Sequence, residues 1–159
     1  MKVLVTGVTG QLGYDVVKEL KKRKIDHLGV SSKEFDISDF EQTRKFILTH
    51  QPDVVIHCAA YTAVDQAEEE VQIAEKVNVL GTNHIALVCK EIDAKMVYIS
   101  TDYVFDGKST VPYEVEDKTN PMSVYGKTKR DGENKVRDLV KNISLYEYLG
   151  SLEKTGTTL

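Results

Sequence analysis

Tyr125 and Lys129 provide the first sign of chemistry in this sequence, because they stand at positions i and i+4. On a helix this spacing places both side chains on one face. A free tyrosine has a pKa of about 10, and a nearby ammonium group stabilises its phenolate. Tyr125 could then serve as a general acid or base near neutral pH. The pair alone is a weak signal, since many helices carry one by chance.

Two hydroxyl residues at the end of a predicted strand, Ser100 and Thr101, strengthen this interpretation. A hydroxyl at the carboxyl end of that strand could hydrogen-bond a substrate oxygen beside the tyrosine. We predict Thr101 for this role, with Ser100 as the alternative. The predicted catalytic residues are therefore Thr101, Tyr125 and Lys129. No spacing typical of metal ligands is present, so no metal is expected.

Three glycines, Gly7, Gly10 and Gly13, follow the first predicted strand and lead into a helix. A pyrophosphate must meet backbone N–H groups at a helix N-terminus, and a Cβ there would block its approach. In this context the G-x-x-G-x-x-G pattern predicts dinucleotide binding, with turn glycines that bind no ligand as the alternative. The predicted contacts in this loop are Gly7, Gly10, Gln11, Leu12 and Gly13.

The second predicted strand ends without the acidic residue that usually binds a ribose 2′-OH. Ser31, Ser32 and Lys33 take its place. Small hydroxyls beside a lysine can accept a 2′-phosphate, and a solvated turn is the alternative. We therefore predict that Ser31 contacts the cofactor. The expected cofactor is NADPH or NADH, with either a slight preference for NADPH or no strong preference between the two.

Small residues follow the third predicted strand, in "HCAAYTAVDQAE". Ala59 and Ala60 are small where a dinucleotide backbone would cross the edge of the sheet. Tyr61 and Thr62 can then line the cofactor pocket, unless the small residues serve packing only. His57 lies within the strand, and we predict that it is a core histidine.

Strands and helices that alternate along the chain must position these residues. The alternation predicts βαβ units and an α/β fold with a doubly wound parallel sheet, whose ligand lies at the carboxyl ends of the strands. A short edge strand is also expected near Glu34 and Phe35, and a helix cap at Ser38 followed by Glu41. The predicted strands span 2–6, 26–30, 53–60 and 94–101, and the helices 11–24, 36–50, 67–92 (one helix or a pair bent at Gly81) and 122–142.

The composition is ordinary for a soluble globular protein, with 159 residues, 41% hydrophobic and 29% charged. This length suffices for one domain with a sizeable core. The net charge of -4 argues against a nucleic-acid partner, which would need a basic face. No apolar run approaches the roughly 20 residues that span a bilayer, so no membrane partner is expected. Cys58 and Cys89 lie in apolar segments and are predicted to be free thiols of a cytoplasmic protein.

Five segments resemble the dTDP-4-dehydrorhamnose reductase family, which belongs to the extended short-chain dehydrogenase/reductases. They are "GVTGQLG", "CAAYTAVDQAE", "VNVLGTN", "YISTDYVFDG" and "NPMSVYGKTKRDGE", in the family's order and spacing. The resemblance covers residues 1 to about 142 and implies a Rossmann-type NAD(P)-binding domain. It also implies hydride transfer from NAD(P)H to the C4 carbonyl of a nucleotide-sugar, dTDP-4-dehydro-L-rhamnose, and a homodimer for the full-length protein.

The same resemblance implies a role for each site residue. Tyr125 would donate a proton to the carbonyl oxygen, Thr101 would help to polarise it, and Lys129 would lower the pKa of the tyrosine and hold the nicotinamide ribose. The implied substrate contacts are Val64, Thr101, Asp102 and Tyr103. The implied cofactor contacts include Asp36, Ile37 and Asn78, although Asp36 could instead cap a helix and Asn78 could be structural.

Two functions from other classes remain open. The regulatory subunit of methionine adenosyltransferase looks similar to this family, so the chain could be a non-catalytic subunit. Such a protein often departs from the catalytic set, whereas Thr101, Tyr125 and Lys129 are all present here. The chain could also be a nucleotide-binding fragment that folds but turns nothing over.

The last 18 residues, "NISLYEYLGSLEKTGTTL", depart from the resemblance. The family runs to nearly twice this length and continues with a strand and a motif similar to "IVRxSWxFG". Synonymous codons for the tail, read two bases later, can encode "YFIVRISWVFGKNGNNF". We therefore expect residues 143–159 to be out of frame, and the alternative is a divergent natural C-terminus. The coding DNA would distinguish the two.

A frameshift near residue 142 would have physical consequences. The chain would lack one central strand and expose the edge of the sheet. It would also lack the substrate pocket, so we expect weak NAD(P)H binding and little reductase activity. Whether the tail is disordered or covers the exposed edge is left open.

Overall fold

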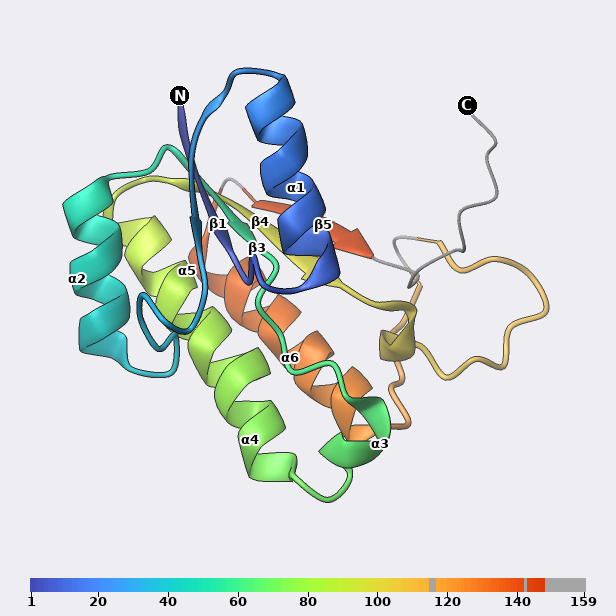
Figure 1. The fold of residues 1–159 in the computed structure, drawn as a ribbon. Coiled ribbons are helices and arrows are strands. Elements are labelled where there is room, and N and C mark those ends of the chain that lie inside the picture. The colour runs from blue at the N-terminus through green and yellow to red at the C-terminus, as the bar shows by residue number, and fades with distance from the viewer. Residues whose placement is uncertain (115–116, 142, 148–159) are drawn as a thin grey trace.

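The computed structural model describes residues 1–114, 117–141 and 143–147, which form a parallel sheet with helices packed against it (Figure 1). The strand order is β2-β1-β3-β4-β5, and all neighbours pair in parallel. This confirms the expected doubly wound α/β sheet. The strands are β1 (Lys2–Thr6), β2 (Asp26–Val30), β3 (Val54–His57), β4 (Lys95–Ser100) and β5 (Ile143–Glu147).

The chain reverses its direction of travel across the sheet after β2, because β3 pairs with the other side of β1. Because of this reversal, right-handed crossovers place the helix before β2 on one face of the sheet and the helices after β2 on the other. Helix α1 (Gln11–Lys22) packs on β1 and β2, whereas α2 (Phe40–His50), α5 (Thr82–Glu91) and α6 (Val124–Leu139) pack side by side as a second layer (Figure 1). The carboxyl ends of the paired strands β1 and β3 form the switch point, outside which ligands bind in such sheets.

The remaining helical elements are short. Two of them, α4 (Val71–Glu75) and the π-helix η1 (Lys76–Gly81), lead into α5 without a gap. They form the long helix expected around Gly81, whose Cα lies against Ile37 so closely that a Cβ would be 2.7 Å from Ile37 Cδ1. The other two are α3 (Val64–Ala67) and the 3-10 helix η2 (Asp102–Val104).

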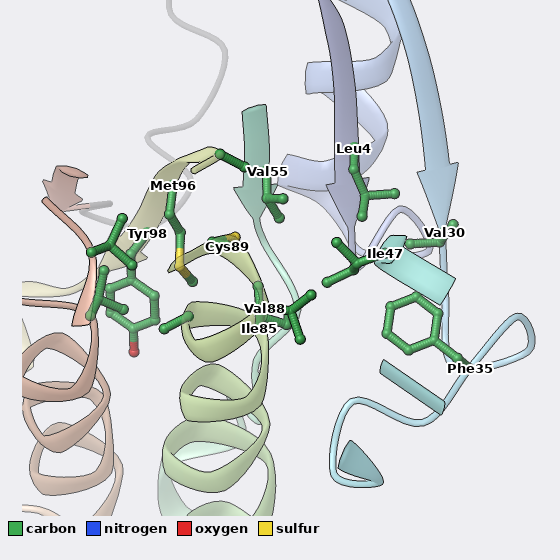
Figure 2. Close-up of a cluster of buried hydrophobic side chains, with 14 residues drawn as sticks. Leu4, Val30, Phe35, Ile47, Val55, Ile85, Val88, Cys89, Met96 and Tyr98 are labelled. Carbon is green, nitrogen blue, oxygen red and sulfur yellow. The ribbon is translucent and has the colours of Figure 1, made fainter. Parts of the chain in front are cut away.

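The main core lies between the sheet and the layer of α2, α5 and α6. Apolar side chains of β1, β3 and β4 meet apolar side chains of the helices, and nearly all of them are fully buried. Figure 2 shows this cluster, with Tyr98 at one end and Phe35 at the other. Its labelled members are Leu4, Val30, Phe35, Ile47, Val55, Ile85, Val88, Cys89, Met96 and Tyr98.

Two local expectations are wrong. No edge strand forms at Glu34 and Phe35, because this segment folds into turns and the Phe35 ring packs inward on Phe46 with 4.7 Å between ring centroids. The cap of α2 is Asp39, which accepts a hydrogen bond from Gln42 N at 3.0 Å, and not Ser38. The Ser38 hydroxyl instead donates to Asp36 Oδ1 at 2.7 Å.

The strand beside β4, which was expected to be missing, is present. Residues 143–147 form β5, which pairs in parallel with β4 from Met96↔Ile143 to Ser100↔Glu147. Strand pairing uses backbone N–H and C=O groups, so a segment can join a sheet without a particular motif. Of the two alternatives for the tail, covering the edge of β4 therefore applies to 143–147. Residues 142 and 148–159 lie outside the described residues, and the reading frame of the tail stays a prediction.

Candidate active site

A cavity of about 940 Å³ opens at the carboxyl ends of β1, β2, β3 and β4. The first turns of α1 and the N-terminal half of α6 complete its wall. All but two of the predicted site residues line it, and the exceptions are Tyr61 and Asn78. Those that line it are Gly7, Gly10, Gln11, Leu12, Gly13, Ser31, Asp36, Ile37, Ala59, Ala60, Thr62, Val64, Thr101, Asp102, Tyr103, Tyr125 and Lys129.

Several lining residues were not predicted. Thr6, Val30 and Cys58 precede predicted contacts at the ends of β1, β2 and β3. The rule that ligands bind at strand ends could have found them. The others of this set are Thr9, Phe35, Val77 and Ile99. Ser32, a possible phosphate contact, and Ser100, the alternative to Thr101, line the cavity as well.

The three glycines of the first loop have different roles. Gly7 has a φ of +73°, and a Cβ there would lie 2.6 Å from Ala59 N in the loop after β3. Gly13 packs against the Gly7 carbonyl, so α1 can lie close to the loop. A Cβ at Gly10 would meet only the Gly7 carbonyl oxygen, at 3.4 Å. Gly10 is therefore not needed for packing, and the open space above it suits the approach of a phosphate group.

Asn78 and Tyr61 lie behind the cavity wall. The buried Asn78 side chain accepts a hydrogen bond from Tyr61 N at 2.8 Å and donates to Tyr61 O at 3.0 Å and to Thr128 Oγ1 at 3.0 Å. The Tyr61 hydroxyl donates to Glu70 Oε2 at 2.6 Å. Asn78 thus fixes the loop after β3 to α6, and its predicted contact with a cofactor remains untested by this geometry.

Tyr125, Lys129 and Thr101 line the cavity and are nearly buried, and the side chains of Tyr125 and Thr101 are hydrogen-bonded to each other. Tyr125 is 9% exposed, Thr101 4% and Lys129 3%. Ser123 caps α6 by accepting from Gly126 N at 3.0 Å, which starts the helix just before the tyrosine. Gly126 lies against the Tyr103 carbonyl, so α6 and η2 can approach closely. The side chains of Tyr125 and Lys129 therefore lie on the same face of the helix, as their i, i+4 spacing predicts.

The electrostatics around Tyr125 differ from the expectation. Burial raises the pKa of Tyr125 above its ordinary value, and a hydrogen bond with the Thr101 side chain acts in the opposite direction. Lys129 Nζ donates to Ile99 O at 2.6 Å and lies 4.3 Å from the centroid of the Tyr98 ring. The ammonium group is thus held by β4, and its effect on the pKa of the tyrosine stays a prediction.

Burial lowers the pKa of Lys129 itself to about 8, while Glu133 acts to raise it. Glu133 is buried one turn further along α6 and accepts a hydrogen bond from Ser100 Oγ. Ser100 is therefore engaged by Glu133, whereas the Thr101 side chain hydrogen-bonds Tyr125 and also donates to Asp102 Oδ1 at 3.1 Å. The contact with Tyr125 favours Thr101, and the choice between the two hydroxyls stays a prediction. Glu133 itself was not predicted, although it continues the i, i+4 face of Tyr125 and Lys129.

Glu133→Ala is expected to lower the free energy of unfolding by about 3 kcal/mol, because it removes the carboxylate beside a buried ammonium group. Chemical denaturation would measure the change. Glu69→Ala, at an exposed position, is the matched control and should change stability by less than about 0.5 kcal/mol. In a chain that already carries Lys129→Met, Glu133→Ala should change the free energy of unfolding by a clearly different amount. If the two substitutions had strictly additive effects, Lys129 and Glu133 would not interact.

His57 is a core histidine, as predicted. Its Nδ1 is hydrogen-bonded to Thr6 Oγ1 at 2.8 Å and its Nε2 to Thr82 Oγ1 at 3.1 Å. Burial lowers the pKa of His57 to about 3, so the ring is neutral. Cys58 and Cys89 are both free thiols. Among the described residues, no group of His, Cys, Asp and Glu is arranged to hold a metal ion, and no helix is long and apolar enough to cross a membrane.

Curated relatives share the sequence over most of this chain. A dTDP-4-dehydrorhamnose reductase of Streptomyces griseus is 40% identical over 86% of the chain and 45% of its own length. The spore coat polysaccharide biosynthesis protein SpsK of Bacillus subtilis is 41% identical over 91% of the chain and 51% of its own length. The chain thus spans about half the length of the curated relatives it matches.

Solved structures share the fold. A dTDP-4-dehydrorhamnose reductase from Clostridium acetobutylicum is 41% identical with a TM-score of 0.89, covering 91% of this chain and 52% of that one. The reductase from Bacillus anthracis, solved in complex with NADP, is 37% identical with a TM-score of 0.88, covering 91% and 51%. The family described as "RmlD substrate binding domain" matches residues 1–146. The chain therefore belongs to the RmlD substrate-binding domain family.

Proposed function

We propose that this chain binds NAD(P)H and carries the catalytic residues of a reductase that converts dTDP-4-dehydro-L-rhamnose to dTDP-L-rhamnose. One observation carries the proposal: Thr101, Tyr125 and Lys129 lie in the same cavity as the glycine loop. Similarity to reductases of this name over most of the chain supports the substrate.

The residues of the cavity fit a dinucleotide. The loop between Gly7 and Gly13 would hold the pyrophosphate at the N-terminus of α1, where the helix dipole favours negative charge. Ala59 and Ala60 leave space where the dinucleotide crosses the sheet. Bound NAD(P)H supplies a hydride.

The chain's own residues supply the proton. Tyr125 is the general acid for the carbonyl oxygen, and Thr101 donates a second hydrogen bond to that oxygen. Tyr125 has a raised pKa, so it stays protonated at neutral pH and can donate. Val64, Asp102 and Tyr103 are the proposed sugar contacts, and Tyr103 is 47% exposed at the cavity mouth.

Two measurements on the purified 159-residue chain test the proposal. Titration with NADH and with NADPH, followed by nicotinamide fluorescence, should show saturable binding. With enzyme in excess, which reveals even the little reductase activity expected of this chain, adding dTDP-4-dehydro-L-rhamnose should then cause a slow loss of the reduced cofactor's absorbance. Binding without any such loss would contradict the reductase and favour a non-catalytic nucleotide-binding protein. Absence of binding would contradict both.

The affinity for NADH should fall as the pH rises through about 8, where Lys129 loses its charge. An ordinary lysine stays charged up to about pH 10, so a decrease of the NADH affinity near pH 8 would be attributed to the buried Lys129 ammonium group. Fluorescence titrations from about pH 7 to about pH 9 would measure it. In Lys129→Met the affinity should be lower throughout and flat across this range. A wild-type affinity that is equally flat would contradict the role of Lys129 in binding.

A further inference from the structure

Helix α6 binds the carboxyl end of β4 through three side chains that are spaced four residues apart on one face. Each of them is hydrogen-bonded to one of three consecutive residues, and the pairs are Tyr125 with Thr101, Lys129 with Ile99, and Glu133 with Ser100. In the last pair the Ser100 hydroxyl donates to the Glu133 carboxylate. This row of contacts fixes how the helix lies along the end of the strand.

Glu133 is the member of the row on α6 that does not line the cavity. It is 5% exposed, and its partner Ser100 lies in the cavity wall. The helix approaches the sheet closely here, because a Cβ at the preceding Gly132 would collide with the Tyr98 hydroxyl. Arg137 Nη2 lies 3.9 Å from the other carboxylate oxygen, Oε2. A buried carboxylate outside the cavity can affect a ligand only through the groups that it binds, and Ser100 is such a group.

Thr101, the residue after Ser100, has local partners that compete with Tyr125. Its hydroxyl oxygen accepts from Tyr103 N at 3.3 Å and donates to Asp102 Oδ1 at 3.1 Å. Both partners belong to η2, so these contacts draw the hydroxyl toward its own loop. The hydrogen bond from Ser100 to α6 acts in the other direction, because it holds the adjacent backbone against the helix that carries Tyr125.

We propose that Glu133 is a positioning residue of this active site, which binds Ser100 and thereby holds the Thr101 hydroxyl next to Tyr125. The inference rests on the proposed function, since the place of Thr101 matters only if its hydroxyl and that of Tyr125 both donate to the carbonyl oxygen. Without Glu133, the end of β4 loses one of its three side-chain contacts with α6, and the contacts within η2 are left to place Thr101.

The charge of the same carboxylate acts on Lys129. Burial lowers the pKa of Lys129 to about 8, and Glu133 acts to raise it. Burial shifts the pKa of the other titratable groups around Lys129 toward their neutral forms, and these groups are Cys58, His57, Tyr98 and Tyr125. Removal of the charge at position 133 should therefore lower the pH at which Lys129 loses its proton.

Single-turnover reduction, with enzyme in excess and NADH saturating, tests the effect on Thr101. Ser100→Ala and Glu133→Ala each remove the hydrogen bond from one side and should slow reduction at least about tenfold, because small misplacements of reacting groups are costly. Glu133→Gln keeps an oxygen that accepts from Ser100, so its rate should stay within about threefold of the wild type. Asp138→Ala, at an exposed acid of the same helix, is the control and should keep the wild-type rate.

The pH dependence of the NADH affinity provides a readout that a merely structural role would not move. In Glu133→Gln the affinity should fall at a pH lower by about 0.5 or more than in the wild type, whereas Ser100→Ala should leave that pH unchanged. Fluorescence titrations from about pH 6 to about pH 9 would measure both. Circular dichroism would establish which variants are folded, and if Glu133→Ala unfolds, Ser100→Ala and Glu133→Gln carry the test.

Wild-type rates in Ser100→Ala and Glu133→Ala would overturn the inference while the proposed function stands, as would a Glu133→Gln chain with the wild-type pH dependence. A slow Ser100→Ala chain beside a fast Glu133→Ala chain would overturn it as well, because Ser100 would then itself donate to the substrate. Failure of the wild-type chain to reduce the substrate would instead overturn the proposed function, and the inference with it.

Discussion

Tyr125→Phe is expected to slow reduction of dTDP-4-dehydro-L-rhamnose by at least about a hundredfold, since general acid catalysis typically contributes that much or more. The variant loses only the hydroxyl that would protonate the carbonyl oxygen. The ring keeps its place, because it packs edge-on against Tyr103 with 5.6 Å between centroids and against the small cluster of Ala67 and Ala74. The dissociation constant for NADH should therefore change by less than about threefold.

Single-turnover measurements with enzyme in excess would test this prediction, because they detect slow chemistry. Tyr14→Phe is the matched control, since Tyr14 is 63% exposed on α1 and does not line the cavity. Equal rates for Tyr125→Phe and the wild-type chain would show that another group donates the proton. Loss of cofactor binding in Tyr125→Phe would show instead that the Tyr125 hydroxyl is needed to hold the cofactor.

Gly10→Val should weaken NADH binding by at least about a hundredfold while the domain stays folded. A Cβ at Gly10 meets only one backbone oxygen, at 3.4 Å, and the residue has a φ of -84°, which valine readily adopts. The added side chain would then occupy the space through which a pyrophosphate reaches the N–H groups of α1. Fluorescence titration would give the affinity, and circular dichroism the folded state.

Gly7→Val provides the contrast within the same loop. Its φ of +73° and the 2.6 Å between the added Cβ and Ala59 N make any side chain there incompatible with the fold, so this variant should unfold. A Gly10→Val chain that binds NADH as the wild type does would mean that the pyrophosphate lies elsewhere. A Gly10→Val chain that unfolds like Gly7→Val would mean that Gly10 is structural.

Short-range patterns predicted much of this site. The i, i+4 spacing of Tyr125 and Lys129 depends only on helix geometry, and the glycine loop depends only on its place between a strand and a helix. Likewise the rule that parallel strands end at one edge brings Thr101 and Ala59 to the same cavity. Each of these predictions needed only the residue type and its nearest elements.

Partners distant in sequence decided the rest. Lys129 binds the Ile99 carbonyl, 30 positions away, and Asn78 connects Tyr61 with Thr128, so neither role follows from local spacing. At the start of α2, Ser38 and Asp39 can both cap, and the hydrogen bond from Ser38 to Asp36 leaves the cap to Asp39. The pairing of β5 with β4 was missed because a backbone ladder leaves little mark in the sequence.

The neutral ring of His57 makes the stability of the folded chain depend on pH. It joins Thr6, at the base of the glycine loop, to Thr82 at the start of α5, across the inside of the sheet. Burial lowers the pKa of His57 from 6.5 to about 3. Between these two pH values the imidazole is therefore protonated in the unfolded chain and neutral in the folded chain. Stability therefore falls steadily between these two values as the solution becomes more acidic. In mildly acid solution the domain should therefore lose part of its free energy of unfolding through a single ring that lies beneath the glycine loop.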